Sequence, residues 1–560
     1  MRSASLARRV GAAGPLFAAA VLGLPAAWPA DLQATERSKG VEIPPGHVLP
    51  AEYLASLPAP VFAPGHTLPR LTRYGWTLDF DTRVEIARRW GYALEWGSVP
   101  WLVGYATAEA VDAALADPKN DAAKCMRLAE EEPETFKLSV VCCRTLPPTD
   151  AVPPETWTRD AEGKFVSHKT EGYDGNIWSD GVDRIYSPAA PDSVWQEAGR
   201  LRAEPLKKIL EKCPIEIVLN GGEYGLGAYG SAKPFWERDP TILAAKGKQS
   251  WYEYTSQAKA RAESIIADAV RKAVPNRSLY IYYTCSGGGS RNRWPGWVDW
   301  GPGYEWFHPV SDLASGEHYY RHANSGWTGG DDILTQALNA RGFEIAHGSP
   351  FCYDWLSAGW VGNGGMGSGT EDRLGDEGLG DLERYRGFLK CMYTAGMVGG
   401  NAGYYAYPKG YERTPLQGFA QPFPPDRPPH WILQITALAE VHALFSRLEP
   451  FIRKGDLLPG PARHRWSKEN PAYEFPTGHA DTRVVARKMK GKPEWLITAW
   501  AADGVVRVVT VDIPELGKVD LAARPAGTVC TATLVASKPA LTTVDVQLDG
   551  ARTGSDPSQP

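Results

Sequence analysis

The residue with the clearest chemical potential is Glu223, which follows the apolar run IEIVL at 215–219 and the segment Asn-Gly-Gly. A carboxylate at the end of an apolar strand is displayed at the edge of a parallel sheet, where barrel enzymes place their active sites. The glycines let backbone and substrate approach closely. We expect the flanking Asn220 and Tyr224 to bind substrate. The alternative is that Glu223 caps a loop or pairs with an arginine.

A second carboxylate is required if Glu223 takes part in glycoside hydrolysis. One group protonates the leaving oxygen, and the other acts as nucleophile or as base for water. Glu317 in SGEHYYR and Asp354 in FCYDWL are the two candidates. Each has a structural alternative, because Glu317 could pair with Arg321 and Asp354 could orient a neighbouring histidine or tyrosine. We prefer Glu317 and keep both.

Aromatic residues gather near these acids and indicate carbohydrate binding. Trp297, Trp300 and Trp306 lie in a Gly- and Pro-punctuated segment at 286–308 that is too irregular for a core element. Aromatic rings have flat apolar faces, which suit stacking on sugar rings. Residues near the other candidate positions are also expected to bind substrate, namely His318, Tyr319, Trp355 and Tyr405. The alternative for the tryptophan segment is a loop that packs on itself over the core.

The elements that must position these residues alternate between short apolar runs and longer amphipathic stretches, the pattern of a parallel sheet built from βα units. Eight strands are predicted, at 71–78, 92–97, 137–144, 215–222, 278–285, 312–320, 348–356 and 401–407. Helices are predicted at 81–90, 194–212, 251–273, 331–341, 381–395 and 430–447. This predicts an α/β fold, a (β/α)8 TIM barrel over 71–455. An open doubly wound sheet is the rival, and it lacks the Gly-rich phosphate turn after the first strand.

The two ends of the chain differ in texture from this central part. Residues 1–30 have a basic start, an apolar run and small residues, which is typical of a signal peptide. That run is too short for a stable membrane span. A Pro-rich lead-in is expected at 31–70, a small all-β sandwich at 460–553 and a disordered tail at 554–560. Strands of the sandwich are expected in the segments TRVVARKM, EWLITAWAA, VVRVVTVDI, VCTATLVA and TTVDVQL, which alternate at period two.

Charge and spacing exclude several function classes. Removal of the signal peptide would take away three arginines and no acid, changing the formal net charge from −5 to −8. Such a protein has no electrostatic basis for binding nucleic acid. The eight cysteines contain no CxxC pair, and the acidic loop at 371–381 lacks EF-hand spacing, so no metal and no other cofactor is expected. Disulfide pairing and oligomeric state stay open.

In this layout the chain resembles the retaining glycoside hydrolases of the large clan-A barrel group, which often carry a C-terminal β-sandwich. The resemblance implies an acid/base Glu at the end of the fourth strand, where Glu223 falls, and a nucleophilic Glu at the end of the seventh. The sequence departs from that pattern twice. Two glycines separate Asn220 from Glu223, and the seventh strand offers Asp354 while Glu317 lies on the sixth.

The sequence therefore predicts an exported glycoside hydrolase, periplasmic or extracellular, that cleaves a poly- or oligosaccharide with two carboxylates. Two alternatives from other classes remain. One is a non-catalytic carbohydrate-binding or cell-surface protein that kept the barrel. The other is a polysaccharide lyase, which would use a tyrosine or histidine base on a uronate.

Overall fold

The computed structural model describes residues 54–55, 57, 59–72, 80–95, 108–142, 153–166, 184–211, 214–221, 233–273, 279–283, 306, 309–316, 318, 320, 330–346, 348–349, 351–356, 378–400, 430–464 and 470–549. The expected signal peptide and the expected tail lie outside these ranges. So does the eighth predicted strand, at 401–407. None of the described helices combines the length and the apolar content needed to cross a bilayer.

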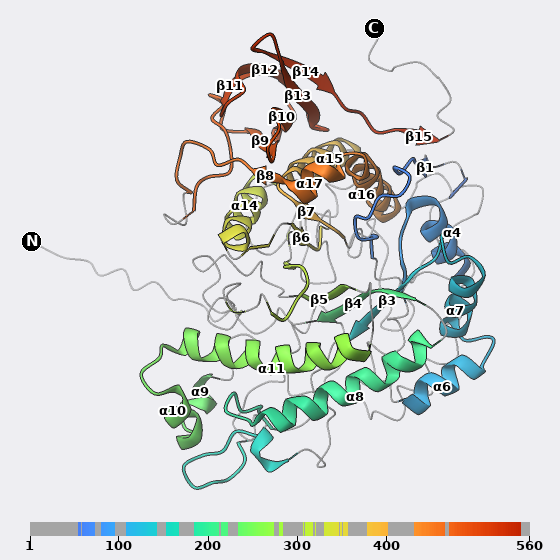
Figure 1. Cartoon of the computed structure of the whole chain (residues 1–560), viewed down its shortest axis with the longest axis vertical. Coiled ribbons are helices and arrows are strands. Elements are labelled where there is room, and N and C mark those ends of the chain that lie inside the picture. The colour runs from blue at the N-terminus through green and yellow to red at the C-terminus, as the bar shows by residue number, and fades with distance from the viewer. Residues whose placement is uncertain are drawn as a thin grey trace, which may run out of the picture.

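A parallel sheet lies in the middle of the molecule (Figure 1). Its strands are β2 (Leu94–Glu95), β3 (Leu138–Cys142), β4 (Ile215–Gly221) and β5 (Leu279–Tyr283), hydrogen-bonded in that order. The apolar runs form strands because both faces of a parallel sheet are covered. Ile217, Val218 and Leu219 of β4, for example, are all buried.

Further parallel pairings extend this sheet in chain order. Leu71 forms a parallel bridge with Tyr92 just before β2. On the other side, Asp312 donates its N–H to Tyr280 of β5, and Ala314 forms a parallel bridge with Cys352. Strand β6 (Cys352–Tyr353) then pairs with β7 (Met397–Val398). Strand pairing thus occurs within seven of the eight predicted segments, and β7 precedes the eighth.

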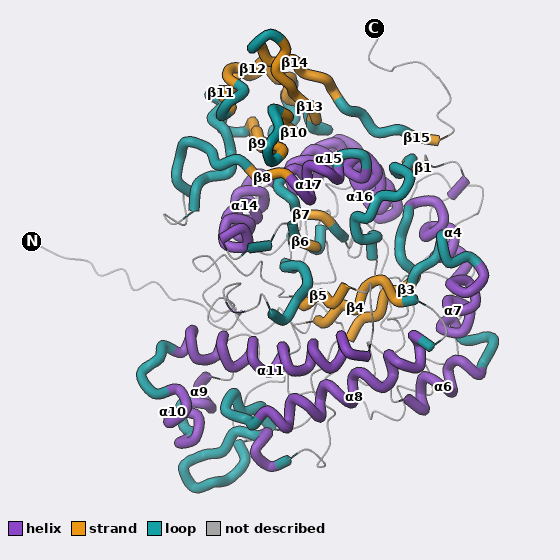
Figure 2. Tube along the Cα trace, in the orientation of Figure 1, coloured by secondary structure: helices purple, strands orange, loops and turns teal. Residues whose placement is uncertain are grey.

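Helices cover both sides of these strands (Figures 1 and 2). They are α4 (Phe80–Trp90), α6 (Ala108–Ala116), α7 (Asp121–Glu131), α8 (Asp192–Leu210), α9 (Lys233–Trp236), α10 (Pro240–Lys246), α11 (Trp251–Ala273), α14 (Gly330–Ala346), α15 (Gly378–Thr394), α16 (His430–Ser446) and α17 (Glu449–Lys454), with a 3-10 turn η2 (Pro154–Thr156). Helices α8 and α11 lie side by side on one side of the sheet. They approach closely at Gly199, where a Cβ would lie 2.7 Å from Cβ of Ala269. All six predicted helices are confirmed, and α6, α7, α9, α10 and α17 were not predicted.

The C-terminal part forms an antiparallel five-stranded sheet and a hairpin. The sheet contains β8 (Gly455–Leu457), β9 (Thr482–Met489), β10 (Glu494–Ala501), β13 (Thr528–Val535) and β14 (Lys538–Thr543), and the hairpin pairs β11 (Arg507–Ile513) with β12 (Gly517–Ala523). Alternate hairpin residues such as Val509 and Val511 share one apolar core with Val484 and Ile497 of the sheet. One face of each sheet is therefore buried against the other, as in a small β-sandwich.

Two connections attach this module to the rest of the chain. Helix α15 lies between β7 and the antiparallel sheet, and Lys390 donates from Nζ to the carbonyl of Gly527 at 2.8 Å. The Pro-rich lead-in contributes β1 (Ala59–Pro60), which pairs with β15 (Leu548–Asp549) near the other end of the chain. The lead-in also donates from Ala63 N to Ser446 Oγ of α16 at 2.8 Å.

Candidate functional site

Strand β4 carries the segment that leads to Glu223. It is flanked on both sides, with Asn220 opposite Cys142 of β3 and opposite Tyr282 of β5. The strand ends at Gly221, two residues before Glu223. Because the strands run parallel, their carboxyl ends lie at one edge of the sheet, where α/β proteins bind their ligands. The strand end that the sequence predicted is therefore present.

The predicted site residues divide into two groups. Those outside the described residues are Glu223, Tyr224, Trp297, Trp300, Glu317, Tyr319 and Tyr405. Asn220 is described through its backbone, and the side chains of Trp306, His318, Asp354 and Trp355 are described in full. The local geometry is therefore built from the latter group and its neighbours.

Asp354 lies directly after β6 and has no exposed surface. Its N–H donates to Val398 O at 2.7 Å, which fixes its backbone against β7. The carboxylate Oδ1 accepts from Gly316 N at 2.7 Å. Burial, followed by the nearby charge of Glu344, raises the pKa of Asp354 to about 8. In this structure the carboxyl group of Asp354 is therefore closed off from solvent.

His318 lies beside this carboxyl group, with Nε2 3.6 Å from Oδ2 of Asp354. Burial lowers the pKa of His318 to about 3. The backbone N–H of His318 donates to Trp355 O at 3.0 Å, so the histidine is held to the residue after Asp354. The alternative weighed for Asp354, that it adjoins a histidine, matches this geometry. Both side chains are buried.

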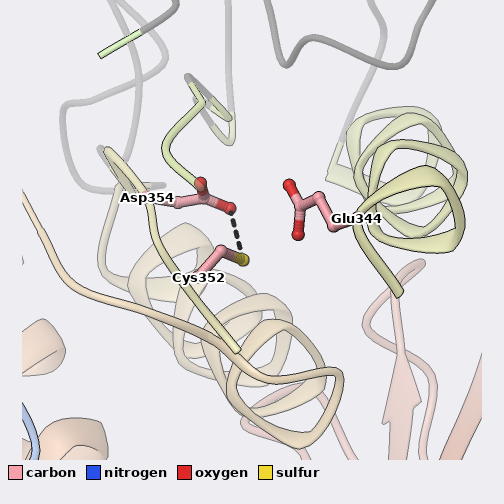
Figure 3. A group of neighbouring side chains, drawn as sticks. All are labelled: Glu344, Cys352 and Asp354. Carbon is pink, nitrogen blue, oxygen red and sulfur yellow. Dashed lines mark hydrogen bonds between the residues drawn. The ribbon is translucent and has the colours of Figure 1, made fainter. Parts of the chain in front are cut away.

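The face of β6 that carries Asp354 looks toward helix α14 (Figure 3). Cys352 and Asp354 are two residues apart and so share a face of the strand. The Cys352 thiol donates to Asp354 Oδ2 at 3.5 Å, and both groups point toward Glu344 of α14. Glu344 is held by Arg341, whose guanidinium donates to Oε2 at 2.9 Å. Burial raises the pKa of the Cys352 thiol.

On the opposite face of β6, Tyr353 contacts Thr72, which belongs to the first predicted strand. Its hydroxyl lies 2.7 Å from Oγ1 of Thr72 and accepts from Thr72 N at 3.1 Å. The cluster around Asp354 is therefore on the helix side of the strand, away from Tyr353. A solvent-accessible carboxylate at the end of the seventh predicted strand would have to lie on the face that carries Tyr353.

The two described tryptophans differ in exposure. Trp355 is 8% exposed, and its backbone N–H donates to Gly316 O at 2.9 Å. Trp306 is half-buried, and its ring meets Tyr252 of α11 edge-on at 5.6 Å between ring centroids. Trp306 thus keeps part of its surface free, as a sugar-binding ring requires, whereas Trp355 is largely covered.

Sequence reasoning missed Arg341, Glu344 and Cys352. A signal was present in α14, where Thr335, Gln336 and Asn339 are buried together with Arg341 and Glu344. A polar group in a helix that is buried all round must find partners inside the protein. Polar residues distributed around the whole helix, and not gathered on one solvent-facing side, therefore indicated a buried polar cluster.

Comparison with known proteins gives only distant structural likeness. No protein-family model matches the chain, and no curated relative was found. A maltogenic α-amylase from Thermotoga neapolitana has 9% identity and a TM-score of 0.35, covering 76% of this chain and 81% of the amylase. An α-galactosidase from Geobacillus stearothermophilus in complex with raffinose has 12% identity and a TM-score of 0.41, covering 89% of this chain and 57% of the galactosidase. An endo-β-1,4-mannanase from Thermotoga petrophila has 8% identity and a TM-score of 0.37, covering 86% and 98%.

These solved structures are glycoside hydrolases by name, which is the class that the sequence resemblance pointed to. At TM-scores from 0.35 to 0.41 the likeness lies below the level that establishes a common fold. The functional proposal below therefore rests on the residues of this chain.

Proposed function

We propose that this chain is an exported glycoside hydrolase that cleaves a poly- or oligosaccharide, with Glu223 as general acid/base and Glu317 as its carboxylate partner. The observation that carries the proposal is the place of β4, which lies inside the parallel sheet and ends two residues before Glu223. Ligands of parallel α/β folds bind at this edge. The aromatic segment that includes Trp306 supplies rings suited to a sugar.

The proposal includes closure of the parallel strands into a (β/α)8 barrel. Two contacts between the last strands of this series and the first predicted strand support closure. The Tyr353 hydroxyl spans from β6 to Thr72, at the first strand position. Gly400, two residues after β7, lies against Leu71, since a Cβ there would be 3.5 Å from Leu71 Cδ2. Both ends of the series are thus brought together, as a closed sheet requires.

Glu317 is the partner in this proposal because Asp354 is fully buried. The residues on either side of Glu317 in the sequence are both fixed to the chain after β6. Gly316 donates to Asp354 Oδ1 at 2.7 Å, and His318 donates to Trp355 O at 3.0 Å. Asp354 then acts as a positioning residue for the segment that carries Glu317. In the reaction Glu223 protonates the leaving oxygen, and Glu317 attacks the sugar or activates water.

The test is turnover of a panel of soluble polysaccharides by the purified full chain, followed through new reducing ends. Glu223→Gln and Glu317→Gln should each lower turnover by about 10²–10⁴, the usual size of such contributions. Glu130→Gln, at an exposed position of α7, is the matched control and should keep wild-type turnover. If the mechanism retains configuration, an aryl glycoside with a good leaving group should restore the first step in Glu223→Gln only, because that step then needs no acid.

Three results would contradict the proposal. Unsaturated products that absorb in the ultraviolet would identify a lyase. Polysaccharide binding without turnover by the wild type would identify a non-catalytic binding protein. Full activity of Glu223→Gln on natural glycans would remove Glu223 from the mechanism.

A further inference from the structure

Three buried side chains, those of Glu344, Cys352 and Asp354, converge between β6 and helix α14, and the buried His318 adjoins one of them, Asp354. Cys352 Sγ lies 3.5 Å from Asp354 Oδ2, and His318 Nε2 lies 3.6 Å from the same oxygen. The ligand atoms of Glu344, Cys352 and Asp354 all lie within 4.8 Å of one another. Figure 3 shows the last three pointing into one space.

These separations suit one particular kind of ligand. A tetrahedral zinc ion with bonds of about 2.0–2.3 Å keeps its ligand atoms about 3.3–3.8 Å apart. The two separations measured to Asp354 Oδ2 already fall in that range. The set of one thiol, one imidazole and two carboxylates is typical of zinc and related transition ions, whereas magnesium and calcium prefer oxygen ligands alone.

Two atoms of the cluster have no hydrogen-bond partner among the described residues: Nε2 of His318 and Oε1 of Glu344. The side chains that carry them are 1% and 0% exposed. The Cys352 thiol donates to Asp354 and also adjoins Glu344, and its single proton does not satisfy both carboxylates at once. An unsatisfied buried polar atom costs about 1–3 kcal/mol, so two in one place call for a ligand.

Charge points the same way. Cys352 as thiolate, with Asp354 and Glu344 as carboxylates, would carry three negative charges in a closed interior. The two charges of a divalent ion and the one of Arg341 balance them, while His318 binds in its neutral form. The outer groups are also in place, because Arg341 holds Glu344 at 2.9 Å and Gly316 N–H holds Asp354 at 2.7 Å.

From these observations we infer that Glu344, Cys352 and Asp354 bind one divalent transition-metal ion, with zinc as the best fit, and that His318, which adjoins Asp354, becomes the fourth ligand when the ion binds. The site is closed, with four protein ligands and no exposed ligand side chain, which is the form of a structural rather than a catalytic zinc site. It joins α14 to β6 and to the segment that precedes Tyr320. The inference does not depend on the glycosidase proposal.

The test is the metal content of the full chain, produced in minimal medium with added Zn²⁺ and, separately, with Co²⁺. Wild type should retain about one ion per chain after dialysis, because a closed site holds its ion through folding. The Co²⁺ form should show a thiolate-to-cobalt charge-transfer band and the visible bands of a tetrahedral ion. Cys352→Ser should lose the charge-transfer band and most of the metal.

Cys391→Ser is the matched control, since Cys391 is equally buried in α15 and outside the cluster. It should keep both the metal and the cobalt spectrum. His318→Gln is the second variant; it should lower the metal content and alter the visible bands. If Cys352→Ser does not fold, His318→Gln and the wild-type spectrum decide.

Wild type without metal after growth in both media would overturn the inference. Metal retained unchanged in both Cys352→Ser and His318→Gln would also overturn it. Because none of these measurements uses turnover, failure of the glycosidase proposal would leave them unaffected.

Discussion

The hydroxyl of Tyr353 lies 2.7 Å from Oγ1 of Thr72, although 281 residues separate the two in the chain. The same hydroxyl accepts from Thr72 N at 3.1 Å and donates to Arg70 O at 3.3 Å. The hydroxyl of Tyr353, in the seventh predicted strand, thus contacts three polar atoms at the start of the first one. This contact fixes the seventh strand position relative to the first.

Tyr353→Phe should lower the free energy of unfolding by about 1–3 kcal/mol, because Thr72 N would lose its buried acceptor. Urea unfolding measures the change. A double-mutant cycle with Thr72→Val should give a coupling energy of about 0.5–3 kcal/mol, as for other contacting pairs. Additive effects of the two substitutions would show that the pair does not contribute to joining the strands.

Arg487 of β9 is fully buried and bound by four backbone carbonyls from other elements. It donates to Thr394 O of α15, to Phe451 O and Ile452 O of α17, and to Gly455 O of β8. Burial, with a smaller effect of Arg341, lowers its pKa to about 9, so it stays charged at neutral pH. The carbonyl ends of helices favour such a cation.

Arg487→Met should therefore destabilise the protein by about 3 kcal/mol, since several buried acceptors would lose their donor while the desolvation cost of the charge is removed. Thermal unfolding checks this. Arg507→Met, an arginine of the same module that pairs with Asp503, is the control and should leave the melting temperature close to that of wild type. Equal effects of both substitutions would contradict the role of Arg487.

Gly387 marks the contact between α15 and the antiparallel sheet. A Cβ at this position would collide with the indole of Trp500 and with Pro525 O. Gly387→Ala should cost about 1–3 kcal/mol through overpacking, more than the gain of about 1 kcal/mol in helix propensity. Calorimetry should show a lower melting temperature. An unchanged or raised melting temperature would mean that the helix and the sheet can separate without cost.

His442 of α16 is buried beside Tyr393, whose hydroxyl lies 2.8 Å from Nδ1. Burial, followed by the charge of His66, lowers the pKa of His442 from 6.5 to about 3. A lowered histidine pKa means that the folded state favours the neutral ring. Its contribution to stability is therefore present above pH 6.5 and is lost as the pH falls from there toward 3.

The measurement is urea unfolding of wild type and His442→Asn at several pH values. Between about pH 7.5 and about pH 5, the free energy of unfolding of the wild type should fall by about 2 kcal/mol more than that of the variant. Only the wild type has an imidazole at this position that is neutral when folded and becomes protonated when unfolded. Parallel pH profiles for the two proteins would show that His442 does not resist protonation in the folded state.

Long, strongly periodic segments were predictable from sequence. The helix expected at 251–273 is α11, and TRVVARKM is β9. Their patterns are local, so a window of ten to twenty residues contains the whole signal. Helix α7 was missed although Asn120 caps it by accepting from Ala122 N. Strand β12 was missed although Val519 and Leu521 alternate with polar residues. In both cases the local signal existed.

Asp354 illustrates what a local pattern does not contain. The sequence placed it on the seventh strand, and period two put it on the face of Cys352. Which face meets helix α14 depends on how sheet and helix pack. That Gly316, His318 and Glu344 surround Asp354 could therefore be seen only in the tertiary structure.

The sequence by itself determined the alternation of strands and helices, the β-rich C-terminal part and the strand that leads to Glu223, because these follow from periodicity and from glycine positions. The tertiary structure decided the surroundings of the acids. It placed Asp354, a candidate catalyst by sequence, in a buried cluster, because burial and the groups that face a side chain are properties of packing between distant segments.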